Sequence, residues 1–451
     1  MVKLPVCGYD SVIKPFKFHK FNLLVLLQWG ILLTILMSFF YHTIFSFAIL
    51  VASPFIALRM VFNPGFRADI MERVCGAKRI GSFPGCLWIH AASVGDVRIA
   101  KILIAALQEK GETRPIIVST FTSTGFVQAQ KEGLDPVFRM PPDSPLWLNG
   151  VFDRLHPSLL VLIEAEMWPG LLDGCRRRRI PVLLANGRIT QESVNWYEKF
   201  PFIFRWLVSG VSFFSVRTQT DAKRLLGLGV TPDKVQVNGN IKFDAVFPDV
   251  NTSPGSAISD SGLIVFGSTR PGDEGPVMEA ILKLREGHPD LRFVIAPRHL
   301  ERCREVEDLI REYGVEFKLH SRLGEMETPE LVLLDEMGEL NRYYASATLA
   351  FVGGGFNPRF AGQNILEPAG YGLPVIFGKH MGNFEEEARL LVESGGGIQI
   401  DYPAQLYDAL HRLLADPDQR RRRGRSAQNT IASNRGVVEK TIELMSCLET
   451  K

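Results

Sequence analysis

The sequence lacks the features that identify several common classes of protein. Its six cysteines are scattered over 451 residues, with no CxxC pair and no histidine at zinc-finger spacing. This pattern argues against a disulfide framework and against a structural metal site. Lys and Arg total 51 against 49 Asp and Glu, and a net charge of +2 gives no global attraction for nucleic acid. We therefore expect a reduced, cytosol-facing protein without a bound metal.

Charged residues are also missing from a long stretch near the N-terminus. Residues 21–58 contain no Lys, Arg, Asp or Glu, and this run is far longer than the signal-peptide core of about 7–15 residues. We interpret it as membrane-embedded. It is long enough for two spans of about 20 residues each, 21–40 and 43–62, with a turn near Tyr41 and His42.

Basic residues flank this apolar run on both sides. They are Lys14, Lys17 and Lys20 before it, and Arg59, Arg67, Arg73, Lys78 and Arg79 after it. Because basic flanks stay on the cytoplasmic side, the pattern favours a helical hairpin within an anchor of residues 1–62. The alternative is one span followed by a helix lying in the plane of the membrane and interrupted at Pro54.

After the anchor, short apolar runs alternate with helical patterns from residue 63 to residue 246. Continuous apolar strands of this kind predict a parallel sheet covered by helices on both faces. Polar residues follow the expected strands, namely Ser93, Asp96, Thr122, Glu166, Asn186 and Arg188. Since the carboxyl ends of parallel strands share one edge, we expect a site there. Two roles are open for Asp96, a charge at a helix N-terminus or a general base.

Residues 247–262, rich in Pro, Ser, Asn and Asp, indicate a linker, and a second alternation of strands and helices occupies residues 263–451.

Three glycines (353–355) follow an apolar run, and Asn364 opens a predicted helix whose amides would favour anions. The loop GSTRPGDE lacks the lysine of a P-loop, which argues against a kinase or ATPase. Arg298, after another strand, is suited to binding phosphate. Two doubly wound, Rossmann-like α/β domains facing across a cleft describe a GT-B glycosyltransferase.

Nine stretches, in order from about Tyr41 to the C-terminus, resemble the 3-deoxy-D-manno-octulosonic acid (Kdo) transferase family of lipopolysaccharide biosynthesis. They are WIHAASVGD, STFTSTG, LVLIEAEMWPG, IPVLLANGRIT, GNIKFD, GSTRPGDE, IAPRHLER, DEMGEL and FVGGGFNPRFAGQNILEPAGYGLPVIFGKHMGNF. The resemblance implies an inverting transfer of Kdo from CMP-Kdo to a lipid A precursor, without metal or cofactor. It places the enzyme at the cell inner membrane, in contact with membrane lipids, with its catalytic domains on the cytoplasmic side.

The resemblance also assigns site residues. Asp96 falls on the family's catalytic base, and Glu166 on the second glutamate of its E-x-E-x-WP motif. The positions that match nucleotide-sugar contacts are Arg298, Gly338, Glu339, Asn364 and Glu367, with Ser268 as a further donor contact. Other candidates for the site are Ser93, Arg188 and Lys242.

The chain departs from the family pattern at three places. Asp96 replaces a glutamate, the loop AGQNILE carries Ala361, Gln363 and Ile365 where the family has Gly, His and Pro, and residues 1–40 have no counterpart. These changes leave two alternatives open. One is transfer of another nucleotide-activated acid sugar, and the other is a catalytically silent, lipid-binding homologue in which Asp96 only caps a helix.

Overall fold

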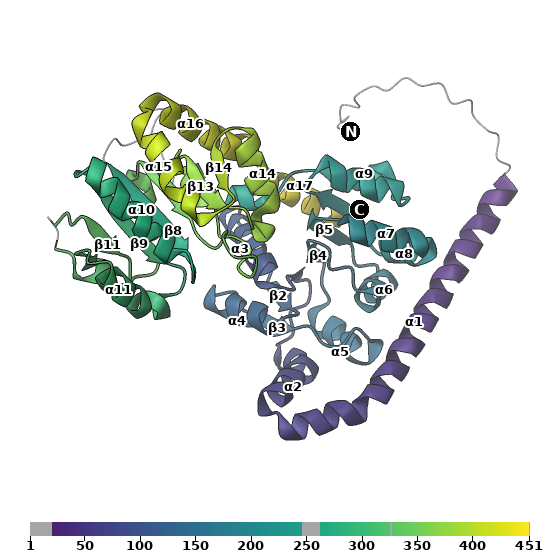
Figure 1. Cartoon of the computed structure of the whole chain (residues 1–451). Helices are drawn as coiled ribbons and strands as arrows, with labels where there is room; N and C mark the ends of the chain where they lie inside the picture. Colours follow the sequence, from purple (N-terminus) through teal and green to yellow (C-terminus); the bar gives the residue numbers. More distant parts are fainter. Residues whose placement is uncertain (1–19, 246–261, 325–326, 451) are drawn as a thin grey trace, which may run out of the picture. The chain divides into compact units, whose positions relative to one another are not determined.

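The computed structural model describes residues 20–245, 262–324 and 327–450, and it divides the chain into two compact units. Unit 1 comprises Met1–Asn238 and Thr441–Lys451, and unit 2 comprises Gly239–Lys440. The predicted linker falls almost wholly outside the described residues. Each unit is built around its own parallel sheet (Figure 1).

Unit 1 contains a seven-stranded sheet of order β3-β2-β1-β4-β5-β6-β7, and all neighbouring strands are parallel. The strands are β1 (Leu87–His90), β2 (Ile116–Thr120), β3 (Val137–Arg139), β4 (Leu159–Ile163), β5 (Val182–Gly187), β6 (Phe213–Val216) and β7 (Val235–Val237). The helices are α1 (Lys20–Phe62), α2 (Pro64–Arg79), α3 (Val94–Glu109), α4 (Ser123–Lys131), α5 (Pro145–Leu155), α6 (Pro169–Arg178), α7 (Gln191–Lys199), α8 (Pro201–Val208) and α9 (Gln219–Gly227). The central strands β1, β4 and β5 are buried along their whole length, as expected for a sheet covered on both faces.

Unit 2 repeats this arrangement with the order β10-β11-β9-β8-β12-β13-β14, again all parallel. Its strands are β8 (Leu263–Thr269), β9 (Arg292–Pro297), β10 (Lys318–Leu319), β11 (Leu331–Leu333), β12 (Leu349–Val352), β13 (Val375–Gly378) and β14 (Gly397–Ile400). Its helices are α10 (Glu274–Gly287), α11 (Cys303–Glu312), α12 (Leu340–Ser346), α13 (Leu366–Gly370), α14 (Glu385–Glu393), α15 (Leu406–Ala415) and α16 (Pro417–Ser433). Helix α17 (Val437–Glu449) begins in unit 2 and ends in unit 1.

The strand orders locate where a ligand would bind in each unit. In unit 1 the direction of winding reverses between β1 and β4, and in unit 2 it reverses between β8 and β12. In doubly wound sheets, ligands bind at the carboxyl ends of the strands that flank this switch point. The loops after β1 and β4, and those after β8 and β12, are therefore the expected centre of a site in each unit.

The domain boundaries differ from the predicted ones at both ends. Residues 239–244 belong to unit 2 because Asn240 donates to Glu387 (3.0 Å) and Asp244 accepts the backbone amides of Gly436 and Val438 (2.7 and 2.6 Å). The last residues belong to unit 1 because Glu449 pairs with Arg114 and accepts a hydrogen bond from Ser158 (2.9 Å). Neither group of contacts could be predicted from the local sequence, because the partners are far apart in the chain.

The predicted hairpin is wrong in its central feature, the turn at Tyr41 and His42. Helix α1 forms one helix of 43 residues (Figure 1). Pro54, where the alternative expected an interruption, lies inside this helix. The chain breaks instead at Asn63, whose side chain accepts the amide of Phe66 (2.9 Å) and caps α2. Nothing in the pair Tyr41-His42 disfavours a helix, since neither residue is Gly or Pro.

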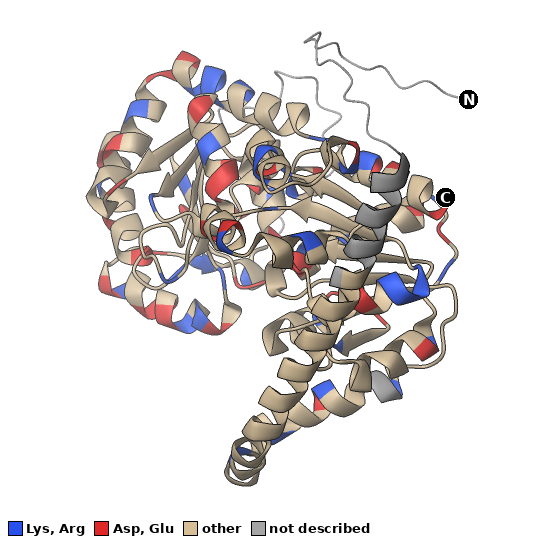
Figure 2. Cartoon of the chain, turned by 90° about the vertical axis from the view of Figure 1, so that its right-hand side faces the viewer, with Lys and Arg blue, Asp and Glu red and all other residues tan. Residues whose placement is uncertain are grey.

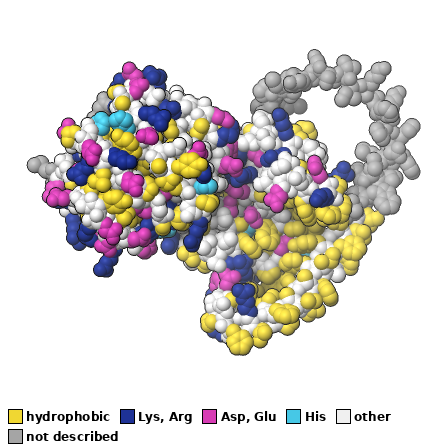
Figure 3. All heavy atoms as spheres, in the orientation of Figure 1, with side chains coloured by type: hydrophobic (Ala, Val, Ile, Leu, Met, Phe, Trp, Pro, Cys, Tyr) yellow, Lys and Arg dark blue, Asp and Glu magenta, His cyan; other side chains and the backbone are white. Residues whose placement is uncertain are grey.

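Helix α1 has the length and composition of a membrane-crossing segment. The stretch Thr34–Phe62 is 29 residues long and strongly apolar, and Figure 2 shows it almost free of charged residues. Large apolar side chains along it are exposed, including Phe47 (65%), Phe55 (72%) and Phe62 (79%) (Figure 3). A soluble protein rarely exposes so long a row of apolar residues, so α1 is a candidate for membrane association.

Candidate active site

Asp96 lies in the first turn of α3, directly after the loop that follows β1. Its Oδ2 accepts a hydrogen bond from the backbone amide of Ser93 (2.8 Å), and its own amide donates to Ser93 Oγ (3.4 Å). This reciprocal arrangement is a capping box, so Asp96 does have the helix-capping role that the sequence left open. Among the described residues nothing donates a hydrogen bond to its second oxygen, Oδ1. A carboxylate held by one oxygen can still accept a proton at the other.

The surroundings of Asp96 raise its basicity. The residue is only 5% exposed. Burial, followed by the nearby negative charge of Glu164 and more weakly of Glu166, raises the pKa of Asp96 to about 6, against the opposing effect of the Ser93 hydrogen bonds. A carboxylate with this pKa is ionised at neutral pH and is a better proton acceptor than an ordinary aspartate.

The two glutamates come from the loop between β4 and α6. Glu166 accepts a hydrogen bond from Trp168 Nε1 (2.8 Å). Burial raises the pKa of Glu166, the Trp168 hydrogen bond opposes this, and the charge of Glu164 adds to it. Glu164 has a positive φ of 64° and forms an ion pair with Arg217, which follows β6. The structure therefore gathers Asp96, Glu164 and Glu166 at the switch point of unit 1.

Glu164 and Arg217 were not among the predicted site residues. Arg217 is 7% exposed, and besides Glu164 it binds the carbonyl oxygen of Asn186 (3.2 Å). Glu164 can be recognised in the sequence as the first glutamate of the E-x-E motif. Its ion pair with Arg217 cannot, because the two residues follow different strands. Arg188 lies exposed at the carboxyl end of β5, near this edge of the sheet.

In unit 2 a buried carboxylate joins the two loops at the switch point. Asp273 Oδ2 accepts the backbone amides of Arg270, after β8, and Gly354, after β12 (both 2.7 Å). Burial raises the pKa of Asp273 to about 6, although these two hydrogen bonds oppose the shift. The residue was not predicted, because its partner Gly354 lies 81 residues away.

The three glycines after β12 are required by close packing as well as by the turn. A Cβ on Gly353 would lie 2.5 Å from Asp273 Oδ2 and 2.7 Å from Thr269 Cα. A Cβ on Gly355 would lie 2.7 Å from the backbone nitrogen of Gly378. The loop thus brings bare main chain to the carboxyl edge of the sheet, where a ligand can approach it closely.

Basic groups lie beside these loops. Ser268, the last residue but one of β8, has a positive φ of 53°, and the amide of Arg298 donates to Thr269 O (3.0 Å). Within the described ranges, no carboxylate forms an ion pair with the half-buried Arg298 side chain. Arg270 Nη1 lies 2.6 Å from His299 Nε2, and burial followed by the charge of Arg270 lowers the pKa of His299. The lowered pKa of His299 favours a neutral ring that accepts a hydrogen bond from Arg270, and the side chain of Arg298 adds positive charge beside these loops.

The remaining predicted donor residues occupy the same edge of the sheet. Asn364 Nδ2 donates to Glu367 Oε1 (2.9 Å), so these two side chains are in direct contact. Gly338 has a φ of 96° and precedes Glu339, which occupies the N-cap position of α12 without a side-chain cap and whose Oε2 lies 3.8 Å from His320 Nε2. The helix expected at Asn364 begins at Leu366 and has only five residues, so its dipole contributes less to anion binding than predicted.

Lys242 is held by the segment that follows β13. Its Nζ donates to Asn383 O (3.0 Å), lies 3.3 Å from the buried Glu387 carboxylate and sits over the Phe384 ring. These contacts hold Lys242 against η5 (Gly382–Phe384) and α14.

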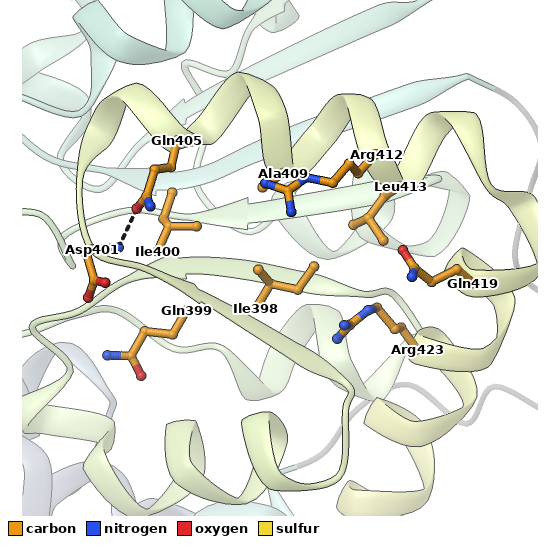
Figure 4. A pocket seen from close by; sticks show the side chains of 10 residues that line it. All are labelled: Ile398, Gln399, Ile400, Asp401, Gln405, Ala409, Arg412, Leu413, Gln419 and Arg423. Carbon is orange, nitrogen blue, oxygen red and sulfur yellow. Dashed lines mark hydrogen bonds between the residues drawn. The ribbon is translucent and has the colours of Figure 1, made fainter.

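A cavity of about 280 Å³ lies between β14, α15 and α16, and it contains none of the predicted residues (Figure 4). One of its two arginines, Arg423, donates to the carbonyl oxygens of Gly395 (2.8 Å) and Gly397 (3.4 Å). That side chain ties α16 to the edge strand of the sheet. The cavity is therefore explained by packing.

Two doubly wound units with polar residues at the carboxyl edge of each sheet define the GT-B class of fold, as predicted. Solved structures of the same architecture include the UDP-GlcNAc 2-epimerase of Neisseria meningitidis bound to UDP-GlcNAc (TM-score 0.52, 15% identity, 80% of this chain and 99% of that one). A glycosyltransferase of Rickettsia africae is also similar (TM-score 0.50, 14% identity, 80% of this chain and 97% of that one).

The chain belongs to the Kdo transferase family. Residues 68–245 match the family model described as 3-deoxy-D-manno-octulosonic-acid transferase (kdotransferase). The chain is 31% identical over 403 residues to the 3-deoxy-D-manno-octulosonic acid transferase of Haemophilus influenzae, covering 87% of this chain and 94% of that protein. It is 28% identical to that of Bordetella pertussis, covering 82% and 89%. The predictions of the family and of a glycosyltransferase are confirmed.

Proposed function

We propose that this enzyme transfers Kdo from CMP-Kdo to a lipid A precursor in lipopolysaccharide biosynthesis, with inversion and without a metal. The observation that carries the proposal is the buried carboxylate of Asp96, raised in pKa and open at Oδ1, at the switch point of unit 1 in a chain of this family. A transferase needs such a base to remove the proton of the acceptor hydroxyl.

The chemistry follows from the groups in each unit. Asp96 Oδ1 takes the proton of the acceptor hydroxyl, whose oxygen forms the new bond to the anomeric carbon of Kdo. The bond from that carbon to the phosphate oxygen breaks, and CMP leaves with its electron pair. Glu164, which is held by its ion pair with Arg217, and more weakly Glu166 place negative charge near Asp96 and maintain its basicity. Arg298 and the main chain of residues 353–355 suit the departing phosphate, whose charge increases in the transition state.

We further propose that five residues of unit 2 contact the donor, because Ser268 lies at the carboxyl end of β8 and the others follow strands of the sheet. The others are Gly338, Glu339, Asn364 and Glu367. The exposed apolar surface of α1 supports attachment to the inner membrane from its cytoplasmic side, where the lipid acceptor is found. Ser93 and Arg188 belong to the acceptor side, in unit 1.

Gln363 favours a second candidate, transfer of a different nucleotide-activated acid sugar. Its side chain is 8% exposed and packs against Gly354, where a Cβ would lie 3.2 Å from Gln363 Nε2. The side-chain amide of Gln363 stays neutral, whereas a histidine can become charged. The glycine loop therefore offers a sugar different hydrogen-bonding groups from those of a loop with histidine.

Thermal unfolding with CMP or UDP distinguishes these donors. Because a ligand that binds only the folded state raises the melting temperature, we expect CMP at 1 mM to stabilise the protein and UDP to have a smaller effect. The Arg298→Ala variant, which removes a proposed phosphate contact, should lose most of the CMP effect. Stronger stabilisation by UDP would contradict a CMP-activated donor.

A further inference from the structure

Three polar residues interrupt the apolar surface of α1 on one face. Ser38, Tyr41 and His42 are spaced i, i+3 and i+4, so their side chains point in the same direction. Each reaches a carboxylate of unit 1. Ser38 Oγ donates to Asp173 (2.7 Å), His42 Nε2 lies 3.3 Å from the same carboxylate, and the Tyr41 hydroxyl donates to Asp143 Oδ2 (2.7 Å).

Apolar contacts support this docking. Met37 and Tyr41 pack against the core of unit 1, and the Tyr41 ring lies 5.7 Å from the ring of Trp206 in α8. This part of α1 therefore lies against protein, while the exposed row of apolar residues farther along the helix does not.

Asp143 connects this docking surface to the catalytic loop. It is 1% exposed, and its Oδ2 and Oδ1 accept the backbone amides of Gly170 (2.6 Å) and Leu171 (2.8 Å). These are the first-turn amides of α6, which need an acceptor. The residue at the N-cap position of α6, Trp168, provides no side-chain cap. Asp143 performs that role from a different loop.

The helix that Asp143 caps begins directly after the loop of Glu164 and Glu166. Trp168, the last residue before α6, holds Glu166 through its indole nitrogen (2.8 Å). Packing around the cap leaves little freedom, since a Cβ on Gly170 would lie 2.6 Å from Asp143 O. A displacement of Asp143 would therefore move the N-terminus of α6, and with it Trp168 and Glu166.

We propose that Tyr41 and Asp143 are a positioning pair that couples the docking of helix α1 to the placement of the Glu164–Trp168 loop. The inference rests on the proposed function, because it assigns that loop to the catalytic site. The apolar helix is then a part of the active-site support as well as a means of attachment. Tyr41 contacts no reacting atom in this account, and it acts through Asp143.

The test compares three single variants of the full chain in detergent micelles. Tyr41→Phe removes the hydroxyl that binds Asp143. Ser38→Ala removes a hydrogen bond of equal length from the same face of α1, but its acceptor is Asp173 within α6 rather than the capping Asp143. Thr43→Val removes a hydroxyl that donates only to Phe39 O within α1. Rates of transfer from CMP-Kdo are measured at a temperature where all three remain folded.

We expect Tyr41→Phe to lower kcat about tenfold with KM for CMP-Kdo within twofold of wild type, because small misplacement of catalytic groups is costly. Ser38→Ala should lower kcat by less than threefold, and Thr43→Val should leave it unchanged. Hydrogen exchange of the Gly170 and Leu171 amides should accelerate in Tyr41→Phe and not in Ser38→Ala.

Equal effects of Tyr41→Phe and Ser38→Ala would overturn the inference, since they would show that docking alone matters. Unchanged kcat and exchange in Tyr41→Phe would overturn it as well. Wild-type protein that transfers nothing from CMP-Kdo would instead refute the proposed function, and the exchange comparison would still decide the link from Tyr41 to α6.

Discussion

Asp96 has the helix-capping role that the sequence presents as one of two alternatives, and this role is compatible with the proposed one as a base. One carboxylate oxygen caps α3 through Ser93, and the proposal assigns the proton to the other. The cap fixes the position of the group, and burial beside Glu164 makes it more basic. Reading Asp96 as a helix cap therefore does not argue against catalysis. Its shorter side chain, in place of the family's glutamate, is held where the capping box puts it.

The raised pKa of Asp96 has a cost in stability that a mutation can reveal. An unfolded aspartate has a pKa near 3.9, whereas burial and Glu164 raise the pKa of the folded one to about 6. The folded state therefore binds the proton more tightly, and this contribution to the free energy of unfolding is lost as pH rises from about 4 through 6. Asp96→Asn, which cannot ionise, should escape that loss.

We expect Asp96→Asn to abolish transfer while raising the free energy of unfolding at pH 8 by about 1–2 kcal/mol relative to wild type. The difference should shrink at pH 4. Urea unfolding at both pH values measures it, and Asp96→Glu, which keeps the charge and matches the family, serves as the active control. Full activity of Asp96→Asn would refute Asp96 as the base, and a difference independent of pH would refute the account of its pKa.

The loops at the switch points show what could be read from the sequence and what could not. Alternating apolar runs and the glycine cluster after β12 were sufficient to predict two parallel sheets and a site at their carboxyl edges. The side chains that hold those loops in place could not be predicted from the sequence. Asp273 reaches Gly354, and Arg217 reaches Glu164, across distances in the chain at which no local pattern operates. Positive φ angles at Glu164 and Ser268 likewise follow from packing rather than from residue type.

Close packing of two glycine-containing loops makes a prediction for unit 2. A Cβ on Gly378 would lie 2.4 Å from the backbone carbonyl carbon and oxygen of Gly355. Because both neighbours are main chain, Gly378→Ala should cost about 1–3 kcal/mol of stability and should weaken CMP binding by displacing the glycine loop. Gly287→Ala, at the end of α10 with open space around it, is the matched control and should be neutral or slightly stabilising. Equal melting temperatures for the two variants would contradict this packing.

At the scale of the whole molecule, the apolar run near the N-terminus was recognised from its missing charges, but its shape was not. The distribution of basic residues favoured a hairpin, whereas the chain forms one helix that docks on unit 1 through Ser38, Tyr41 and His42. Tyr41 and His42 resembled a turn because their partners, Asp143 and Asp173, lie more than 100 residues away. For the same reason the return of the C-terminus to unit 1 through Glu449 could not be predicted.

The most direct test of the account is the mass of the lipid formed by the purified full chain. Wild-type protein is incubated with CMP-Kdo and a tetraacylated lipid A precursor in the presence of EDTA, with Asp96→Asn in parallel, and the lipids are analysed by mass spectrometry. We predict that the precursor gains the mass of one or more Kdo residues with wild type, despite the chelator, and gains none with Asp96→Asn. An unmodified lipid in the wild-type reaction, or a product formed equally well by Asp96→Asn, would contradict the account.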